Sequence, residues 1–484
     1  MSTVPYKGND KLLFGIILGV LAFWLFAQTT LNINVVMAKD LRMETAVMNI
    51  AVSITSLFSG IFIVVMGGLA DRVGRLKIIR IGFVFSIIGS LFVGLTPAGA
   101  MASPVLIAGR IFQGLSGACI MPASLALIKT YWEGAGRQRA ISLWSMGSWG
   151  GSGFCALFGG LIAQNIGWRY IFFASALISV IGMWMIKGTP ESKASQSGEK
   201  KGLDIAGILT FMIVMIALQV LVSQGSQLGW TSTVSLILAA AIIVFGIAFF
   251  RIENHKEAPL IDFNLFKNST YSGATISNFL LNGVVGMLIV SLMLLQVGAG
   301  LSAQTAGLLT LGYAIAIVAF IRVGEKLLRR FGPRKPMIWG CIIVGISIML
   351  LLPTNLKTGT YEILAVISYT FFGIGLAFYA TPSTDAALSN LPESQAGAGS
   401  GIYKMASSLG AAFGVAISTG IFVGLSSINA PSSMLDNVIK FQGRQDNIAI
   451  RQAAMIALLF NLFMVVIAII AIIKTIPNTK ENSD

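Results

Sequence analysis

Three charged side chains lie inside stretches of the chain that are otherwise apolar and long enough to cross a bilayer: Arg110, Asp385 and Lys404. A charge at that depth is costly unless it is paired or faces water, so each is a candidate functional group. Asp385 is the acid best placed to bind and release a proton. Lys404 is its expected partner, because consecutive antiparallel helices would hold the two at similar depths. The alternative for Asp385 is a static salt bridge near the cytoplasmic gate.

Residues for metal or enzyme chemistry are scarce. The only histidine, His255, lies in a charged loop, and Cys119, Cys155 and Cys341 lie within apolar runs. We therefore expect small buried cysteines, no disulfide and no metal site. A membrane enzyme would need a convergent polar cluster, so it is the least favoured class. The sequence contains no Walker-type loop that would bind ATP, and we expect no cofactor. A proton gradient is the expected energy source for the protein's activity.

The composition is that of a membrane protein. Of 484 residues, 55% are hydrophobic and only 11% are charged, whereas soluble domains carry about 25% charged residues. A net charge of +14 would suggest nucleic-acid binding in a soluble protein. Here the Lys and Arg residues lie in short loops between apolar runs, where they orient helices, so we expect no nucleic-acid partner.

Apolar runs of about 18 to 25 residues, the length that crosses the hydrocarbon core, predict an all-α protein with fourteen transmembrane helices. The predicted spans are 12–36, 46–70, 77–97, 103–128, 139–164, 168–187, 203–223, 232–250, 270–294, 303–322, 336–353, 362–389, 397–424 and 453–474. Most Lys and Arg residues lie at the termini and in the loops after even-numbered spans. The positive-inside rule therefore places both termini in the cytoplasm.

The spans are grouped six, two and six by polar segments at 190–202 and 251–268. We predict an N-terminal six-helix bundle over 1–189, a linker with two extra helices over 190–268, and a C-terminal six-helix bundle over 269–484. The halves repeat, because an offset of 260 residues aligns Pro122 with Pro382 and Gly150 with Gly410. Such repeats build transporters, whose substrate site lies near the bilayer midplane between the halves.

Several motifs resemble those of one family. GGLADRVGRLK at 67–77 resembles the signature loop between helices 2 and 3 of the major facilitator superfamily. GRIFQG at 109–114 is similar to its helix 4 motif, and GWRYIF at 167–172 to the entry of its helix 6. The six-two-six layout and PLID at 259–262 resemble the fourteen-helix drug:proton antiporter branch.

Within that branch, WLFAQ at 24–28, SWGGSG at 148–153 and YATPSTD at 379–385 resemble the staphylococcal norfloxacin-type multidrug efflux pumps. The resemblance implies a multi-pass protein of the bacterial cell membrane. It also implies that the protein exports drugs such as quinolones and cationic dyes in exchange for protons, by alternating access. The expected partners are small-molecule drugs, protons and the lipid bilayer, and the protein is expected to act as a monomer.

Two departures from the branch pattern limit this inference. The helix 5 antiporter motif ends in Gly-Pro-x-x-Gly-Gly, whereas residues 155–160 read CALFGG and lack the proline. The first span also contains no acid, so a coupling acid must lie elsewhere. Because fold does not fix function, an exporter of one specific metabolite or lipid remains the alternative.

The resemblance also implies roles for charged residues. The loop motif residues Gly67, Asp71, Arg72, Gly74 and Arg75 would control the cytoplasmic gate. Asp71 would cap a helix or pair with a base while the cavity opens outward, and the alternative is a solvated loop charge.

A weaker copy of the motif at 322–335 contains Glu325. Arg110 would take part in proton transfer, or else anchor neighbouring helices through their backbone carbonyls. The candidates for proton coupling are therefore Asp385, Arg110, Glu325 and Lys404.

Aromatic and amide side chains within the spans could line a cavity for amphipathic compounds through stacking and cation–π contacts. The candidates are Trp24, Phe26, Gln28, Trp149, Phe279, Asn282, Gln296 and Tyr379. The alternative for each is a side chain that faces lipid or packs between helices. A long external segment at 426–450 would cover part of the outer mouth or bind a partner, with a solvated loop as its alternative.

Overall fold

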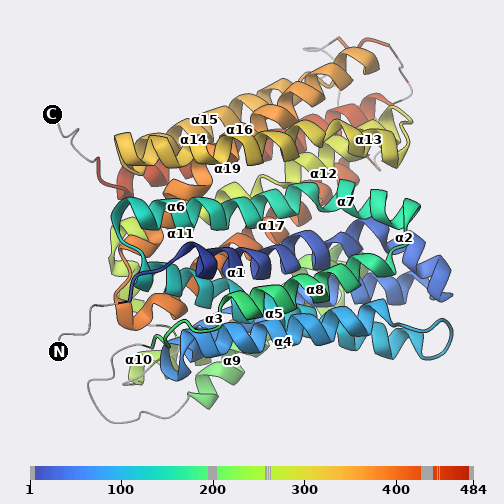
Figure 1. Cartoon of the computed structure of the whole chain (residues 1–484). Coiled ribbons are helices and arrows are strands. Elements are labelled where there is room, and N and C mark those ends of the chain that lie inside the picture. The colour runs from blue at the N-terminus through green and yellow to red at the C-terminus, as the bar shows by residue number, and fades with distance from the viewer. Residues whose placement is uncertain are drawn as a thin grey trace, which may run out of the picture. The chain divides into compact units, whose positions relative to one another are not determined.

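A computed structural model describes residues 6–193, 204–256, 259, 261, 263–426, 440–443, 445 and 447–478. Every regular element in these ranges is a helix (Figure 1). The helices form two compact units. Unit 1 comprises Met1–Leu221, Thr231–Tyr271 and Asp385–Met405, and unit 2 comprises Val222–Trp230, Ser272–Thr384 and Ala406–Asp484.

Unit 1 contains the first ten α-helices, except for the end of α9. They are α1 (Asp10–Leu21), α2 (Thr30–Leu41), α3 (Thr45–Val73), α4 (Arg75–Gly94), α5 (Ala102–Tyr131), α6 (Gly134–Ser145), α7 (Gly151–Asn165), α8 (Arg169–Met185), α9 (Ile205–Leu228) and α10 (Thr233–His255). Short helices η1 (Ala22–Phe26), η2 (Ala27–Thr29), η3 (Met146–Gly150), η4 (Phe263–Lys267) and η6 (Glu393–Gln395) also belong to it.

Unit 2 is built from the later helices. They are α11 (Ser269–Gly283), α12 (Gly286–Met293), η5 (Leu294–Gly298), α13 (Ala303–Leu309), α14 (Leu311–Phe331), α15 (Arg334–Leu351), α16 (Thr358–Ser389), α17 (Ala396–Ser426) and α19 (Ile448–Thr475). The last residues of α16 and the first turns of α17 belong to unit 1.

The described residues contain twelve helices that are long and apolar enough to cross a membrane, or up to thirteen if one bent pair counts as a span. That pair, Leu157–Asn165 and Arg169–Met185, is bent by 118°. It lies where the sequence predicts the spans 139–164 and 168–187. The first of these is covered by α6, η3 and α7, with Arg137 and Arg139 in the first two turns of α6. The second is covered by α8, which has 17 residues.

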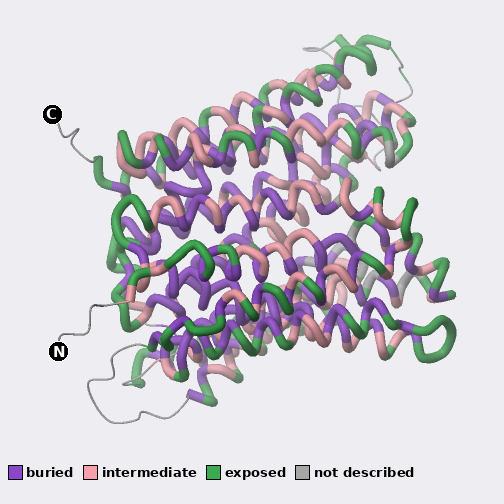
Figure 2. Tube along the Cα trace, viewed as in Figure 1, coloured by how far each residue is buried: buried purple, intermediate pink, exposed green. Residues whose placement is uncertain are grey.

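The helices of unit 1 differ widely in burial (Figure 2). The most apolar window of α5 is 83% buried, whereas that of α10 is 11% buried. The α10 residues Leu236, Ile237 and Ile243 are exposed, which suits a helix whose solvent is lipid. The central helix α5 therefore positions the functional side chains, and α10 forms part of the apolar outer surface.

Close helix packing depends on paired glycines in both units. In unit 1, a Cβ on Gly89 of α4 would lie 2.7 Å from the carbonyl oxygen of Gly109 on α5. In unit 2, a Cβ on Gly340 of α15 would lie 2.6 Å from the carbonyl oxygen of Gly375 on α16. Small residues at such crossings let helix backbones touch, which is how membrane helices gain van der Waals contact.

Three helical segments of the described chain contain a π-helical turn: η1, η3 and η5. A π turn widens the helix locally and is often found at functional sites. Each of the three includes at least one residue predicted to contact substrate, namely Trp24 and Phe26 in η1, Trp149 in η3 and Gln296 in η5.

Candidate functional site

The carboxylate of Asp71 caps a helix far away in sequence. It accepts hydrogen bonds from the backbone N–H of Gly397, at 3.0 Å and 2.8 Å to its two oxygens, and from that of Ala398 at 3.0 Å. These amides belong to the first turn of α17, where a negative charge complements the helix dipole. Asp71 is 4% exposed, so the alternative of a solvated loop charge is not what the structure shows.

Arg75 holds this carboxylate in place. Its Nε and Nη2 donate to one Asp71 oxygen at 2.9 Å and 2.8 Å, and Nη2 also donates to the carbonyl of Glu393 at 2.5 Å. Nη1 donates to Thr130 Oγ1 at 2.5 Å and to Ser192 Oγ at 3.1 Å. The planar guanidinium thus links α4, α5, the segment after α8 and η6. We call Asp71, Arg75 and these partners the Asp71 cluster.

The backbone of Gly67, a residue of the motif, lies directly against α17. A Cβ at Gly67 would lie 2.4 Å from the carbonyl oxygen of Gly397, and a Cβ at Gly397 would lie 2.3 Å from the carbonyl oxygen of Gly67. Neither position can carry a side chain without moving α3 or α17. The close approach brings Asp71 within hydrogen-bonding distance of the α17 amides.

Glu191 is a functional partner that the sequence analysis missed. Its two carboxylate oxygens accept from the backbone N–H of Leu76 at 2.8 Å and of Lys77 at 3.0 Å, so Glu191 caps α4. Gly74, with φ of +133°, makes the turn between α3 and α4. The only sequence signal is an acid in the polar segment after α8, because nothing local links that segment to the α3–α4 turn.

Asp385 lies near the end of α16 and pairs with Arg137 of α6, at 3.4 Å between Arg137 Nε and Asp385 Oδ1. Arg137 Nη2 donates to Ser389 Oγ at 2.8 Å, and Lys129 Nζ donates to the carbonyl of Leu388 at 2.6 Å. Two bases of unit 1 therefore bind the end of α16. The sequence analysis did not consider Arg137 as the partner of Asp385.

Lys404, the partner that the sequence suggested for Asp385, is buried in α17 and lies over the ring of Trp144, 4.9 Å from its centroid. The indole N–H of Trp144 donates to Ser124 Oγ at 2.9 Å. Lys404 therefore contributes a cation–π contact between α17 and α6.

Arg110 is fully buried and makes the contacts of an anchor. Its guanidinium donates to the carbonyls of Ala27 at 2.7 Å, Ala51 at 3.0 Å and Val52 at 3.3 Å, and to Gln113 Oε1 at 2.7 Å. These acceptors lie in η2, α3 and α5. The Arg110 side chain therefore links η2, α3 and α5.

Glu325 pairs within its own helix. Its two oxygens bind Arg322 and Arg329 of α14, and both arginine side chains are 42% exposed. Gly332, with φ of +71°, ends the helix. We call Glu325, Arg322 and Arg329 the Glu325 cluster.

The substrate candidates of unit 1 lie where η1 and η3 pack together. Phe26 is buried and meets Phe158 edge to face at 5.1 Å, so it packs between helices. Trp24 and Trp149 are half-buried, and Gln28 is buried in η2. The buried Nε1 of Trp24 has no hydrogen-bond partner among the described residues, which leaves a donor that a ligand could use.

The substrate candidates of unit 2 join a polar network, apart from Phe279 and Gln296. Asn282 Nδ2 donates to the carbonyl of Asn278 at 2.7 Å, and Asn278 Nδ2 donates to Ser407 Oγ at 2.6 Å. The hydroxyl of Tyr379 lies 2.7 Å from Ser277 Oγ.

Phe279 packs against Phe413, with 6.0 Å between ring centroids, and Gln296 is half-buried in η5. Of the external segment 426–450, residues 427–439, 444 and 446 lie outside the described part of the chain.

Comparison with known proteins identifies the family. The model of the Major Facilitator Superfamily matches residues 12–415 and, again, 270–483. The chain is 48% identical over 422 residues to the quinolone resistance protein NorB of Staphylococcus aureus (strain MRSA252), which covers 87% of this chain and 90% of the relative.

Solved structures share the fold at low identity. The proton:xylose symporter XylE matches with a TM-score of 0.63 and 17% identity over 98% of this chain and 97% of its own. A bacterial homologue of the iron transporter ferroportin matches with a TM-score of 0.60 and 11% identity over 96% and 98%. The chain belongs to the major facilitator superfamily and is a multi-pass transporter of the bacterial cell membrane rather than an enzyme.

Proposed function

We propose that this transporter exports amphipathic or hydrophobic compounds, such as quinolones and cationic dyes, from the cytoplasm in exchange for protons. The observation that carries the proposal is the 48% identity to the quinolone resistance protein over 87% of the chain. Export would proceed by alternating access, with the proton gradient as the driving force and a single chain as the working unit.

The proposed topology has fourteen transmembrane helices and cytoplasmic termini. It divides the chain into a six-helix bundle at 1–189, two extra helices within 190–268 and a second six-helix bundle at 269–484. The helices α6 to α8 support the count, because they cover both predicted spans of the bent region. The distribution of Lys and Arg supports the orientation.

The Asp71 cluster is proposed to close the cytoplasmic side. Its hydrogen bonds tie the α3–α4 turn to the first turn of α17, and most of α17 belongs to unit 2. Loss of the Asp71 cap would leave the first backbone amides of α17 without their acceptor and would free the start of that helix to move. The cluster is therefore expected to set the balance between conformations and to make no contact with substrate.

Asp385 is proposed as the acid that couples proton binding to transport. Arg137 is proposed as the residue whose ion pair depends on the charge of Asp385. Protonation of Asp385 would remove the attraction between the carboxylate and the Arg137 guanidinium, which lies 3.4 Å away. The end of α16 would keep the hydrogen bonds from Arg137 to Ser389 and from Lys129 to the Leu388 carbonyl. Arg110, Glu325 and Lys404 remain weaker candidates, because backbone carbonyls, neighbouring arginines and an indole ring respectively engage their charges.

Substrate is proposed to contact the π-helical turns and the polar network of α11. Trp24 is the leading candidate in unit 1, because its indole N–H could donate to a carbonyl or carboxylate of a drug. Asn282 and Tyr379 would offer polar groups in unit 2, with Gln28, Trp149, Phe279 and Gln296 as further candidates. Phe26 is the exception, since its ring is occupied by packing against Phe158.

The test uses purified protein in liposomes with an imposed pH gradient, and compares the wild type with Asp385→Asn. We expect ethidium and norfloxacin to accumulate in wild-type vesicles, to compete with each other, and to show little gradient-driven uptake in the variant. Undiminished uptake by Asp385→Asn would remove Asp385 from the coupling step. Competition confined to one chemical class would instead favour the exporter of a specific metabolite or lipid.

A further inference from the structure

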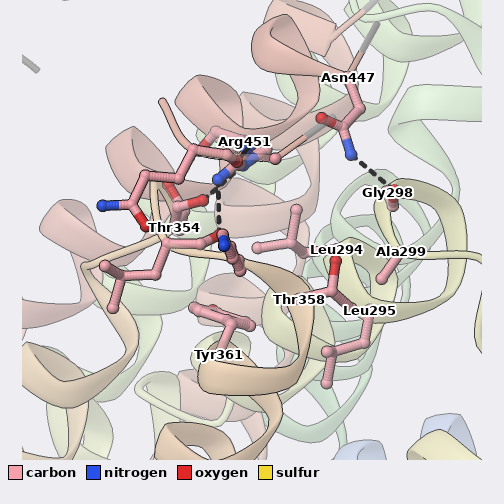
Figure 3. Close-up of a pocket in the computed structure, with 13 residues that line it drawn as sticks. Leu294, Leu295, Gly298, Ala299, Thr354, Thr358, Tyr361, Asn447 and Arg451 are labelled. Atoms are coloured by element: carbon pink, nitrogen blue, oxygen red, sulfur yellow. Dashed lines mark hydrogen bonds between the residues drawn. The ribbon is translucent and has the colours of Figure 1, made fainter. Parts of the chain in front are cut away.

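A cavity of about 280 Å³ lies in unit 2, where η5 and α15 end and where α16 and α19 begin (Figure 3). Its volume is close to the lower limit of small-molecule pockets, about 300 Å³. Its described walls come from η5 and Ala299, from the connection before α16 and the first turn of α16, from Gln442, Gly443 and Asn447, and from Arg451 in the first turn of α19. None of these residues belongs to the gating, proton-coupling or substrate candidates.

Arg451 fixes the walls of this cavity. Its Nε donates to the carbonyl of Thr354 at 2.5 Å, Nη1 to that of Gln442 at 2.9 Å, and Nη2 to that of Leu356 at 2.7 Å. In return, Thr354 Oγ1 donates to the Arg451 carbonyl at 2.8 Å. Charge-assisted bonds to three carbonyls hold two connecting segments against α19, so the cavity is preorganised.

Asn447 lines the cavity and has a buried side-chain acceptor that lacks a partner among the described residues. Its Nδ2 donates to the carbonyl of Gly298 at 2.7 Å, which orients the amide (Figure 3). The side chain is buried, with the residue 7% exposed, and Oδ1 has no hydrogen-bond partner among the described residues. A buried acceptor without a partner is costly, so an N–H or O–H donor that reaches this oxygen would be stabilised.

The charge of the lining favours an anion. Two cations, Lys357 and Arg451, line the cavity, and its described lining residues include no carboxylate. Lys357 is exposed, so its ammonium is accessible to a ligand that enters from water. Leu294, Leu295 and Tyr361 add an apolar and aromatic surface. A ligand that matches all three features is flat, apolar and negatively charged, and carries a donor away from its charge.

We propose that this cavity binds a small aromatic carboxylate that carries a hydroxyl or amino donor. The carboxylate faces Lys357, the donor reaches Asn447 Oδ1, and the ring packs on Leu294, Leu295 and Tyr361. The proposal goes beyond drug export, because it requires binding and no transport. In the proposed topology this end of unit 2 faces the outside of the cell.

The probe is 6-hydroxy-2-naphthoate, a fluorescent carboxylate with its hydroxyl at the opposite end, titrated into the full-length protein in lipid nanodiscs. We expect saturable binding of one molecule per chain. The analogue 2-naphthoate, which lacks the donor, is expected to bind about three- to tenfold more weakly, the usual contribution of one hydrogen bond. The cation 2-naphthylmethylamine is expected not to compete. Absence of saturable binding, or equal competition by the cation, would overturn the proposal.

Three variants locate the probe. Lys357→Gln is expected to weaken binding about two- to fivefold, as for an exposed ion pair, while Lys440→Gln, an exposed lysine outside the lining, leaves it unchanged. Asn447→Leu is expected to abolish the difference between the two naphthoates. Ala299→Phe places a ring in the cavity and is expected to eliminate binding.

Melting temperatures of all variants are measured first. If Asn447→Leu does not fold, the comparison of the two naphthoates on wild-type protein and the result for Ala299→Phe decide whether the probe binds in this cavity. Equal weakening by Lys357→Gln and Lys440→Gln, or full binding by Ala299→Phe, would place the probe elsewhere and refute the site.

Discussion

The Asp71 cluster and the Glu325 cluster arise from related sequences but form different structures. The acid of each cluster lies in the last two turns of a long helix that is followed by a glycine with positive φ, Gly74 in unit 1 and Gly332 in unit 2. Three residues before the glycine stands Asp71 in one case and Arg329 in the other. The acid of the second copy, Glu325, therefore lies one turn earlier, and its ion pairs among the described residues are with arginines of its own helix.

The displacement of the acid by one turn changes what the cluster can do. The Asp71 carboxylate binds the N-terminus of another helix and is buried with Arg75, whose side chain is 2% exposed. Both arginines of the Glu325 cluster are 42% exposed, and exposed pairs contribute little. The first cluster joins distant segments, whereas the second stabilises a single helix, so control of the gate is expected to lie with the first.

The largest effect is expected when the two acids are neutralised. Asp71→Asn removes the charge that Arg75 and two α17 amides share. A coupling of about 1–3 kcal/mol shifts a two-state equilibrium about 5- to 150-fold, so we expect ethidium export from cells to fall at least about tenfold. Glu325→Gln loses exposed pairs and is expected to reduce export less than about twofold.

Drug binding to purified protein is the control, and it should change little in Asp71→Asn because the cluster is proposed to make no contact with substrate. Equal loss of export in the two variants would end the distinction between the clusters. Lost binding with normal gating would assign Asp71 to the substrate site instead.

The next effect concerns the arginines. Arg75 uses its planar fork to bind Asp71, Thr130, Ser192 and the Glu393 carbonyl, and a lysine cannot reproduce this geometry. We expect Arg75→Lys to lower the melting temperature in detergent by several degrees and export by about fivefold, since buried charge-assisted bonds are worth about 1.5–3 kcal/mol. Arg329→Lys is expected to match the wild type in both measurements, and a comparable loss there would mean that exposure does not decide the difference.

A smaller effect is expected at Glu191, because it supports the Asp71 cluster without contacting Asp71. Removing a helix cap costs about 1 kcal/mol, so Glu191→Ala should lower the melting temperature by a few degrees. The matched control is Glu133→Ala, because Glu133 precedes α6 but its side chain makes no capping hydrogen bond. Equal melting of the two variants would show that the cap on α4 is dispensable.

The smallest effect is expected at the solvent-exposed ion pair of Asp40 and Arg169, which serves as the reference for both clusters. Hydrogen bonds from Arg169 lower the pKa of Asp40 from its usual value, against a smaller opposing effect of burial and with a further contribution from Trp168. The stability that this pair adds is present above the unfolded-state pKa and is lost as pH falls through the lower folded-state value.

The difference in melting temperature between wild type and Asp40→Asn is therefore expected to be small at pH 6 and to shrink as the pH falls below about 4. Thermal unfolding across this range measures it. A difference that grows on acidification would contradict the assignment.

Sequence patterns identified the helices and the motif residues better than they identified the residues that contact the motif and Asp385. The apolar run 12–36 indicates one span, and helical residues continue from Asp10 to Leu41. The π turn at η1 has no signature in the hydrophobic period, so the faces presented by Trp24 and Phe26 could not be assigned. The place of Arg110 in an apolar span and in a family motif singled it out, and the anchor was one of two roles left open for it.

The missed partners are non-local. Arg137 meets Asp385 across 248 positions, and Glu191 meets Leu76 across 115. A single sequence gives the charge of such residues but not the residue they reach. The suggested Asp385–Lys404 pair was based on depth in adjacent spans, which ignores the α6 helix that supplies Arg137.

The position of Arg110 also bears on how the chain is inserted during synthesis. An arginine at the centre of a helix raises the cost of insertion by about 2.5–3.5 kcal/mol. The carbonyls that bind it, in Ala27, Ala51 and Val52, all precede α5 in the sequence. They are therefore already in the bilayer when α5 leaves the translocon, so the earlier helices can act as the template that admits the charged one.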